Sequence, residues 1–365
     1  MTQTACDSAR KILSIDLGGS KMLSAITTVS IDSDGARRAE LSGIARRALS
    51  KDSGKEGVWD AILSAVDETM KLVDASWDEI DSIGCTIPGI ADPKRGYWVY
   101  APFSGIRDYP IAEELNARYC KPVFADNDVN ACAWGEKVFG VCQNVDNYLW
   151  ITISNGIGGG LVLDGKIYPG KFSGAAEIGH FNVVEDGALC GCGNRGCLEA
   201  TAAGPGIARA YRELVKKTIL GSSDVSPADA LDWVAYLGRT YGKTNVESIY
   251  PDGEIEAAEK ATAVMIADEA RRGNPLALAV YRDVGKYVGR AASWVANLIN
   301  PEKIVIGGGV AGAFDLFFPS LWETFQKCLF KQTNGSLTIE KTGLGYEAGL
   351  LGAASLAYDN PYKDK

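Results

Sequence analysis

One histidine and three cysteines form the densest group of potential metal ligands in the sequence. His180 is the only histidine of the chain, and Cys190, Cys192 and Cys197 lie within eight residues of one another. One imidazole with three thiolates is a standard ligand set for structural zinc. Because four protein ligands complete the tetrahedron, we expect this metal not to activate water. Disulfide bonds are the alternative, which a reducing compartment disfavours.

Carboxylates flank this cluster on both sides. Glu177 lies three residues before His180, and Glu199 lies two residues after Cys197. If one ring nitrogen of His180 binds zinc, the other N–H becomes an oriented donor. Carboxylates beside an imidazole suit a ligand with several hydroxyl groups, so we expect zinc to fix these side chains around a polar pocket. The alternative is that each glutamate is a solvated surface charge.

Three polar residues separate a predicted buried strand from a predicted helix: Asp126, Asn127 and Asp128. A general base for an alcohol is best held rigidly at such a strand end. Asn127 can donate hydrogen bonds to a polyol and accept them from it. N-capping is the alternative, because Asp and Asn are common helix caps. Capping and catalysis can also be divided among the three residues.

Two glycine-rich turns interrupt predicted β-hairpins. The first turn holds Asp16, Gly18, Gly19, Ser20 and Lys21, and the second covers residues 156–160. Backbone N–H groups in such turns form anion-binding nests, so the pair suggests opposed clamps on a polyphosphate. Asp16 is a candidate ligand for Mg²⁺. Neither turn matches the P-loop pattern. The alternative is a tight hairpin that needs positive φ.

A third glycine-rich segment, residues 307–312, follows a predicted strand and satisfies G-x-G-x-x-G. The pattern makes an NAD-dependent dehydrogenase the rival function. Only about fifty residues follow the segment, which leaves little chain for a dinucleotide-binding half. No acidic residue is evident at a strand end about twenty residues further on. We favour a turn that contacts a nucleotide, with a purely structural turn as the alternative.

The elements that must position these groups alternate between strands and helices. We expect strands over residues 11–16, 23–29, 80–85, 122–125, 148–154, 161–163, 303–306 and 337–341. We expect helices over residues 56–75, 129–139, most of 204–299, 314–328 and 347–358. Each half begins with a glycine-turned hairpin, so the alternation predicts an α/β fold with two similar halves facing a cleft.

Composition favours a folded protein with a small-molecule ligand. The 365 residues suggest two domains, and 46% apolar with 23% charged residues excludes a disordered chain. The net charge of −9 disfavours nucleic acid and anionic membranes as partners, but not a small anionic ligand. The first fifteen residues contain no signal-peptide core, and no apolar run is long enough to span a membrane. We therefore expect a soluble, cytoplasmic protein.

Together these motifs resemble the ROK family, named for repressors, open reading frames and sugar kinases. The resemblance runs from about Lys11 to Tyr358, and the histidine–cysteine cluster is its most specific part. The other matching motifs are residues 16–21, Pro88-Gly89 with Asp92, Asn127-Asp128, residues 156–160, Glu177 and residues 307–309. The family implies the actin-like, ribonuclease-H-like ATPase fold with duplicated domains. Its kinases phosphorylate hexoses with ATP and Mg²⁺, closing two domains over the sugar.

The resemblance also implies a role for each matching residue. Asp128 becomes the catalytic base, and zinc is bound by His180, Cys190, Cys192 and Cys197. The implied sugar contacts are Gly89, Asn127, Asp128, Glu177, His180 and Glu199. The implied ATP contacts are Asp16, Gly18, Gly19, Ser20, Lys21, Asn155, Gly156, Gly158, Gly159, Gly308 and Gly309, with Asp16 also a candidate Mg²⁺ ligand.

The resemblance implies a domain division and a homodimer as well. The first domain covers residues 1–128 and is completed by the C-terminal segment 347–365. The second covers residues 129–346 and contains the zinc motif at residues 180–197.

The sequence departs from the family at three places. Many family glucokinases contact the sugar through the Asn of an Asn-Leu pair, and Pro102 stands at the corresponding position here. This change disfavours glucose and leaves the choice among hexoses open. Asn155 replaces the usual Thr of the second glycine turn, which alters a phosphate or nucleotide contact. Residues 216–259 form a longer segment than is usual for the family.

We therefore expect ATP-dependent phosphorylation of a hexose hydroxyl. The alternative within the family is a sugar-sensing transcriptional regulator without kinase activity. Such repressors carry an N-terminal DNA-binding helix-turn-helix of several dozen residues, whereas fifteen residues precede Asp16 here and the net charge is −9. Both features favour the kinase.

Overall fold

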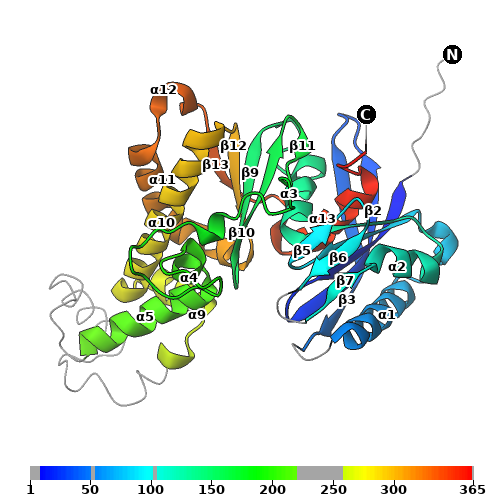
Figure 1. Cartoon of the computed structure of the whole chain (residues 1–365), viewed down its shortest axis with the longest axis horizontal. Coiled ribbons are helices and arrows are strands. Elements are labelled where there is room, and N and C mark those ends of the chain that lie inside the picture. The colour runs from blue at the N-terminus through cyan, green and yellow to red at the C-terminus, as the bar shows by residue number, and fades with distance from the viewer. Residues whose placement is uncertain (1–8, 51–53, 102–104, 220–257, 364–365) are drawn as a thin grey trace. The chain divides into compact units, whose positions relative to one another are not determined.

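The computed structural model describes residues 9–50, 54–101, 105–219 and 258–363 (Figure 1). Pro102 and most of the segment 216–259, two of the departures noted above, lie outside the described residues. Strands and helices alternate along the described chain, as the sequence predicts, and the strands form three sheets in the described part.

The first sheet has the strand order β3-β2-β1-β4-β8. β1 (Arg10–Leu17) and β2 (Lys21–Ile31) form the predicted hairpin, and β4 (Ser82–Ile87) and β8 (Val123–Asn127) extend the sheet in parallel. β4 is buried at every residue, as expected of a strand covered on both faces. The edge strand β3 (Arg37–Ala48) was not predicted. Exposed and partly buried side chains alternate along it, and its many Arg and Ala residues are poor strand signals.

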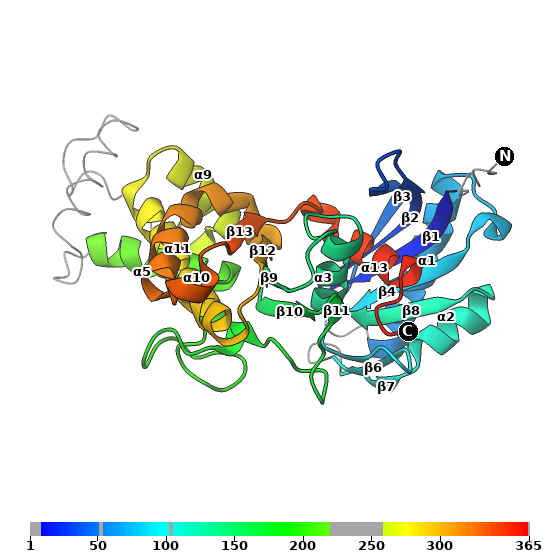
Figure 2. The ribbon, with the colours of Figure 1, turned by 90° about the horizontal axis from the view of Figure 1, so that it is seen from above.

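Helices cover both faces of this sheet. Leu13 of β1 belongs to the core that contains side chains of α1 (Gly54–Leu72), whereas Ile12 belongs to a cluster with side chains of α13 (Ala348–Tyr358). α13 lies so close to the sheet that a Cβ at Gly84 would be 1.8 Å from the Ala353 carbonyl oxygen. Figures 1 and 2 both show α13 beside α3, the helix that follows β8.

A small sheet and several short elements between β4 and β8 were missed by the sequence analysis. They are β5 (Ile90–Asp92), β6 (Tyr97–Tyr100), β7 (Arg107–Tyr109) and α2 (Ile111–Tyr119). The short helix η1 (Trp77–Glu79), which precedes β4, was missed as well. Each is too short for hydrophobic periodicity to reveal it. The buried Trp98 anchors the small sheet by donating its indole N–H to the carbonyl oxygen of Pro88 at 2.9 Å.

The second sheet has the order β11-β10-β9-β12-β13. Its strands are β9 (Tyr148–Ile153), β10 (Ile157–Leu163), β11 (Lys166–Ile167), β12 (Lys303–Gly307) and β13 (Thr338–Lys341). The predicted glycine turn over residues 156–160 is wrong in its extent, because Gly158, Gly159 and Gly160 lie within β10. Gly160 is needed there for space, since a Cβ would meet the Val129 carbonyl oxygen at 2.9 Å.

The remaining described helices are α3 (Asp128–Val138), α4 (Leu198–Ala202), α5 (Gly204–Ile219), α9 (Ala263–Arg271), α10 (Pro275–Ile299), α11 (Phe314–Cys328) and α12 (Lys331–Asn334). The predicted break at residues 273–275 is confirmed, and Asn274 caps α10 by accepting from the amides of Leu276 and Ala277. α10 packs so closely on α11 that a Cβ at Gly285 would be 2.2 Å from the Phe317 carbonyl oxygen.

The chain divides into two compact units. The first unit comprises Met1–Trp150, Gly159–Ala176 and Thr342–Lys365, and the second comprises Ile151–Gly158 and Glu177–Lys341. The division after residue 128 that the sequence analysis expects stays a prediction. None of the described helices combines the length and the hydropathy that a membrane span requires.

Candidate functional site

The junction of β8 and α3 holds the predicted base in the first unit. Asn127 is the N-cap of α3: its Oδ1 accepts from the amides of Val129 at 2.9 Å and Asn130 at 3.2 Å. Its Nδ2 donates to the carbonyl oxygen of Gly89 at 2.7 Å, and Gly89 has a φ of 90°. Asp128 is the first residue of α3, and its Oδ1 accepts from the Val129 amide at 3.0 Å. The residue that caps α3 is therefore Asn127, and the predicted base is the next residue, Asp128.

Burial and neighbouring charge make Asp128 a carboxylate that titrates near neutral pH. The pKa of Asp128 is raised to about 7, mainly by desolvation and also by the negative charges of Asp16 and Asp126, against the opposing effect of the backbone N–H groups of Val129 and Asp128. A general base works best when its pKa lies close to the operating pH. The side chain is half-buried, so it combines this shift with access to a ligand.

Asp16 lies near the end of β1 in the same unit. Its Oδ1 accepts a hydrogen bond of 2.7 Å from the hydroxyl of Thr86, a residue that the sequence analysis did not single out. Burial raises the pKa of the Asp16 carboxyl, whereas Thr86 and Lys21 lower it. No group of three or more potential metal ligands surrounds Asp16 in the described part of the chain. One carboxylate is nevertheless a donor set that suits Mg²⁺, which usually keeps its waters and binds substrate phosphates.

The first glycine turn joins β1 to β2. Gly18 and Gly19 do not have positive φ, so the alternative that this hairpin requires it is wrong. Gly18 instead allows a close backbone approach, because a Cβ would be 3.0 Å from the carbonyl oxygen of Lys21. Gly19 and Ser20 are exposed at the tip. Lys21 donates to the hydroxyl of Tyr346 at 2.5 Å and lies over its ring at 4.6 Å, a partner that the sequence did not reveal.

The second glycine turn lies between β9 and β10 in the second unit. The amide of Ser154 donates to the carbonyl oxygen of Gly156 at 2.8 Å, with the exposed Asn155 between them. Glu199 of α4 accepts from the amide of Ile157 at 3.0 Å, and a Cβ at Gly156 would be 2.6 Å from its Oε2. Glu199 is therefore not the isolated surface charge of the alternative interpretation. It connects this turn to the helix that follows Cys197.

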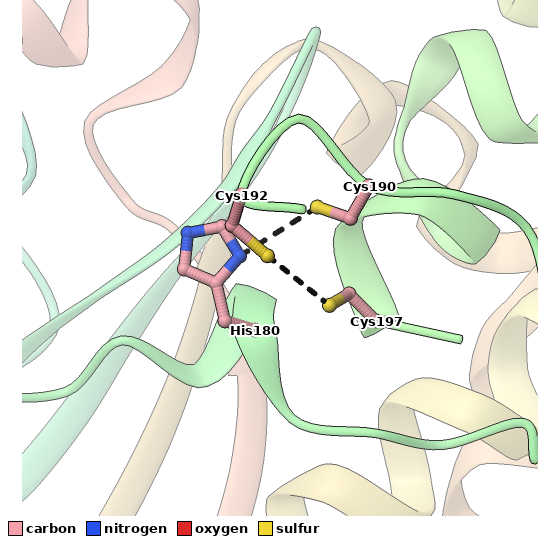
Figure 3. Close-up of side chains that lie close together, drawn as sticks. All are labelled: His180, Cys190, Cys192 and Cys197. Carbon is pink, nitrogen blue, oxygen red and sulfur yellow. Dashed lines mark hydrogen bonds between the residues drawn. The ribbon is translucent and has the colours of Figure 1, made fainter. Parts of the chain in front are cut away.

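The predicted metal ligands converge in the second unit (Figure 3). The ligand atoms of His180, Cys190, Cys192 and Cys197 all lie within 4.8 Å of one another. His180 ends η2 (Ile178–His180), its Nδ1 is 3.7 Å from the sulfur of Cys190, and the sulfurs of Cys192 and Cys197 are 3.6 Å apart. None of these cysteines is in a disulfide. The donor set and its spacing fit tetrahedral zinc.

The second ring nitrogen of His180, Nε2, lies on an exposed side chain beside Glu177. Nε2 of His180 is 3.9 Å from a carboxylate oxygen of Glu177, and both side chains are exposed. The sulfur of Cys190 is also 3.7 Å from Oε1 of Glu199. The second unit thus brings Glu177, His180 and Glu199 to one place, as the spacing in the sequence suggests. Metal binding would require these thiols to be deprotonated.

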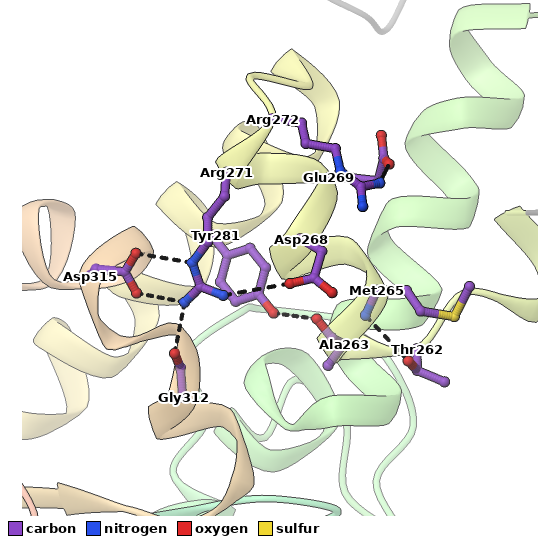
Figure 4. Close-up of polar contacts among 10 residues, drawn as sticks. All are labelled: Thr262, Ala263, Met265, Asp268, Glu269, Arg271, Arg272, Tyr281, Gly312 and Asp315. Atoms are coloured by element: carbon purple, nitrogen blue, oxygen red, sulfur yellow. Dashed lines mark hydrogen bonds and ion pairs between the residues drawn. The ribbon is translucent and has the colours of Figure 1, made fainter.

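The third glycine-rich segment follows β12. Gly308 has a φ of 85°, and a Cβ there would be 2.5 Å from the Ile153 carbonyl oxygen. The chain then forms η3 (Gly309–Ala313) and enters α11. Arg271 of α9 fixes this segment: it donates to the carbonyl oxygen of Gly312 at 2.7 Å and pairs with Asp315 at 2.8 Å (Figure 4). Arg271 was missed because nothing in its local sequence marks a partner 41 residues away.

The geometry thus yields two groups of predicted residues. The first unit contains Asp16, Gly18, Gly19, Ser20, Lys21, Gly89, Asn127 and Asp128, together with Gly159. The second unit contains Asn155, Gly156, Gly158, Glu177, His180, Cys190, Cys192, Cys197, Glu199, Gly308 and Gly309.

Comparisons with known proteins confirm the resemblance. Residues 12–360 match the ROK family. A glucokinase of Streptomyces coelicolor is 30% identical over 346 residues, which cover 94% of this chain and 96% of that protein. The transcriptional repressor Mlc of Escherichia coli is 26% identical over 296 residues, 81% of this chain and 65% of the repressor.

A solved structure supports the fold. A ROK family glucokinase from Streptomyces griseus, in complex with glucose and AMPPNP, is 29% identical and has a TM-score of 0.69, with 95% of this chain and 98% of that chain covered. The predicted α/β class with the actin-like ATPase fold is therefore confirmed.

Proposed function

This chain is a member of the ROK family, and from that premise we propose that it transfers a phosphoryl group from ATP to a hydroxyl of a hexose. Similarity to a glucokinase over nearly the full length of both chains supports this proposal. The observation that carries it is the state of Asp128. This half-buried carboxylate has a pKa raised to about 7, and the N-cap of α3 is the neighbouring Asn127 rather than Asp128.

In the proposed reaction, Asp128 accepts the proton of the attacking hydroxyl group. A carboxylate oxygen accepts the hydroxyl proton while the sugar oxygen forms a bond to the γ-phosphorus and the bond to the leaving ADP oxygen breaks. Phosphoryl transfer passes through a loose, in-line transition state, so most of the rate comes from positioning and charge neutralisation. In the proposal, Lys21 and the backbone amides of the first glycine turn contact the phosphates. When bound beside Asp16, Mg²⁺ would neutralise phosphate charge.

Three side chains of the second unit are proposed as sugar contacts. Glu177 and His180 are exposed and adjacent, and Glu199 lies against the cysteine cluster. Zinc bound by His180 and the three cysteines would hold these side chains in place without taking part in the reaction, because its four ligands are all protein groups. The proposed ATP contacts in this unit are Asn155, Gly156, Gly308 and Gly309.

The proposal is tested by ADP release in a coupled assay across a panel of hexoses. The matched variant is Asp128→Asn, which keeps the size and the single acceptor position at Oδ1 but cannot take a proton. We expect it to fold and to retain zinc while turnover falls at least about a hundredfold, the lower end for loss of a general base. Full turnover in Asp128→Asn would show that Asp128 is not the base. If none of the hexoses in the panel leads to ADP release, the kinase assignment is wrong.

A sugar-responsive transcriptional regulator is the second candidate, supported by the similarity to Mlc. It receives less support, because the glucokinase relatives match nearly their full length whereas this chain covers 65% of the repressor. Titration with duplex DNA at low salt separates the two. The kinase proposal expects no binding, since a net charge of −9 opposes association with phosphates.

A further inference from the structure

The last residue of α13 and the residues after it are held in place by side chains from distant parts of the chain. We call residues 358–363 the C-terminal tail. Arg10 of β1 donates to the carbonyl oxygen of Tyr358 at 3.1 Å, and Trp134 of α3 donates its indole N–H to the carbonyl oxygen of Asp359 at 2.5 Å. The amide of Tyr362 donates to Oδ1 of Asn360 at 2.9 Å, which closes a turn. The tail therefore has a defined path.

This path brings a tyrosine hydroxyl to the strand that carries the proposed base. The hydroxyl of Tyr362 donates to Oδ2 of Asp126, whose residue is only 1% exposed. The other oxygen of Asp126 accepts from the amide of Asn127 at 2.6 Å. Side chains alternate between the faces of a strand, so Asp126 faces the tail while Asn127 faces the opposite side. The proposed mechanism uses neither Asp126 nor Tyr362.

Asp126 depends on hydrogen bonds for its place in the interior. A buried carboxylate is costly unless its oxygens are satisfied. The groups that act on Asp126 are the Tyr362 hydroxyl, the Asn127 amide and the Asn130 side chain, with no positive charge among them. Burial raises the pKa of Asp126 to about 6, and the Tyr362 hydrogen bond opposes this rise. Loss of the hydroxyl would leave one oxygen of Asp126 without this donor.

A displacement of Asp126 would be passed on directly to the residues that follow it. Its Oδ1 bond holds the backbone of Asn127, whose side chain in turn caps α3 and holds the carbonyl group of Gly89. Asp128 begins the helix that this cap defines. The hydrogen bond from the tail is therefore linked, through Asp126 and the Asn127 cap, to the start of the helix that carries Asp128.

We propose that Tyr362 is a positioning residue for the Asn127–Asp128 pair, acting through the carboxylate of Asp126. This inference rests on the proposed function for its kinetic consequences, because it takes Asp128 as the base. Its structural content, the placement of the two side chains, does not depend on that function.

The experiment compares Tyr362→Phe with Tyr358→Phe in the full-length chain. Tyr358 is in the same tail, and its side chain makes its contacts through the ring, which is tilted against the ring of Phe139 and lies under the guanidinium of Arg10. We expect Tyr362→Phe to lower kcat about tenfold, within the range for displaced reacting groups, with the KM for ATP changed less than twofold. Tyr358→Phe should retain the wild-type kcat. Equal kcat in wild type and Tyr362→Phe would overturn the proposal.

A double-mutant cycle tests the route through Asp126. If Tyr362 acts through this carboxylate, Tyr362→Phe combined with Asp126→Asn loses no more activity than the worse single variant, whereas additive losses overturn the route. The pH profile gives a second readout. Asp128 faces Asp16 of β1 and Asp126 of β8, and both negative charges raise its pKa. Because loss of the Tyr362 donor favours neutral Asp126, the acid limb of kcat/KM should move to lower pH.

A crystal structure of Tyr362→Phe keeps this inference separate from the proposed function. Displaced Asn127 and Asp128 side chains support positioning even if the wild type phosphorylates no sugar. Unshifted side chains overturn it, whatever the activity of the wild type.

Discussion

Asn127 and Asp128 are adjacent and chemically similar, yet their surroundings assign them different tasks. The Asn127 side chain is occupied by two helix amides and the Gly89 carbonyl group. The Asp128 carboxylate accepts from backbone amides at the start of α3 and is desolvated. A carboxylate with an uncommitted oxygen can accept a proton, whereas an amide cannot. The local environment therefore favours Asp128 as the base and leaves Asn127 to hold the backbone.

The raised pKa of Asp128 predicts an acid limit to activity. The base must be ionised, and its pKa is raised to about 7. As pH falls through 7, the protonated fraction grows, so kcat/KM should fall about tenfold per pH unit below that value and level off above it. The measurement is kcat/KM for the best hexose between pH 5 and 9. A flat profile across pH 6–8 would contradict the role of Asp128.

At the scale of elements, the cysteine cluster connects η2, the loop before α4, and α4 itself. His180 ends η2, and Cys197 is the N-cap of α4, which carries Glu199. The loop is compact because Gly196 has a φ of 73° and lies where a Cβ would be 1.7 Å from the Val184 carbonyl oxygen. One metal bound here would fix three elements and, through Glu199, the second glycine turn.

Cys192→Ser is therefore expected to weaken both sugar binding and stability. Serine is a poor zinc ligand, and loss of the metal frees His180, Glu177 and Glu199 from their common scaffold. The measurements are zinc content, Tm and hexose affinity by calorimetry. Cys328→Ser, at an exposed thiol outside the cluster, is the control. Unchanged hexose affinity in zinc-depleted protein would contradict the scaffold function.

Arg271 also connects elements, because it joins α9 to the segment that follows β12. Its guanidinium pairs with Asp315 and donates to Gly312, which fixes η3 (Figure 4). Arg271→Ala should raise the KM for ATP about tenfold by freeing this segment, with the hexose KM little changed. Arg272→Ala is the matched control, since Arg272 is exposed and pairs only with Glu269 among the described residues. Equal effects of the two variants would argue against the role.

At the scale of the whole molecule, ligand binding is expected to stabilise the chain. A ligand that binds only the native state adds about 2.7 kcal/mol at one hundred times its Kd. A hexose substrate and an ATP analogue with Mg²⁺ should therefore each raise Tm in a thermal-shift measurement, whereas NAD⁺ should not. A rise with NAD⁺ alone would revive the dehydrogenase alternative. A homodimer, which the family resemblance implies, also stays a prediction, and light scattering in solution would test it.

The sequence by itself determined the chemistry-bearing residues and the long elements. The spacing of His180, Cys190, Cys192 and Cys197 indicated the cluster, and apolar runs located β1, β4 and α10, because ligand type and periodicity are local properties of the chain. The tertiary structure alone decided which partners these residues have. Thr86 meets Asp16, Arg271 meets Gly312, and Tyr362 meets Asp126 across 236 residues. Such pairings depend on how distant elements pack, and no local pattern records that arrangement.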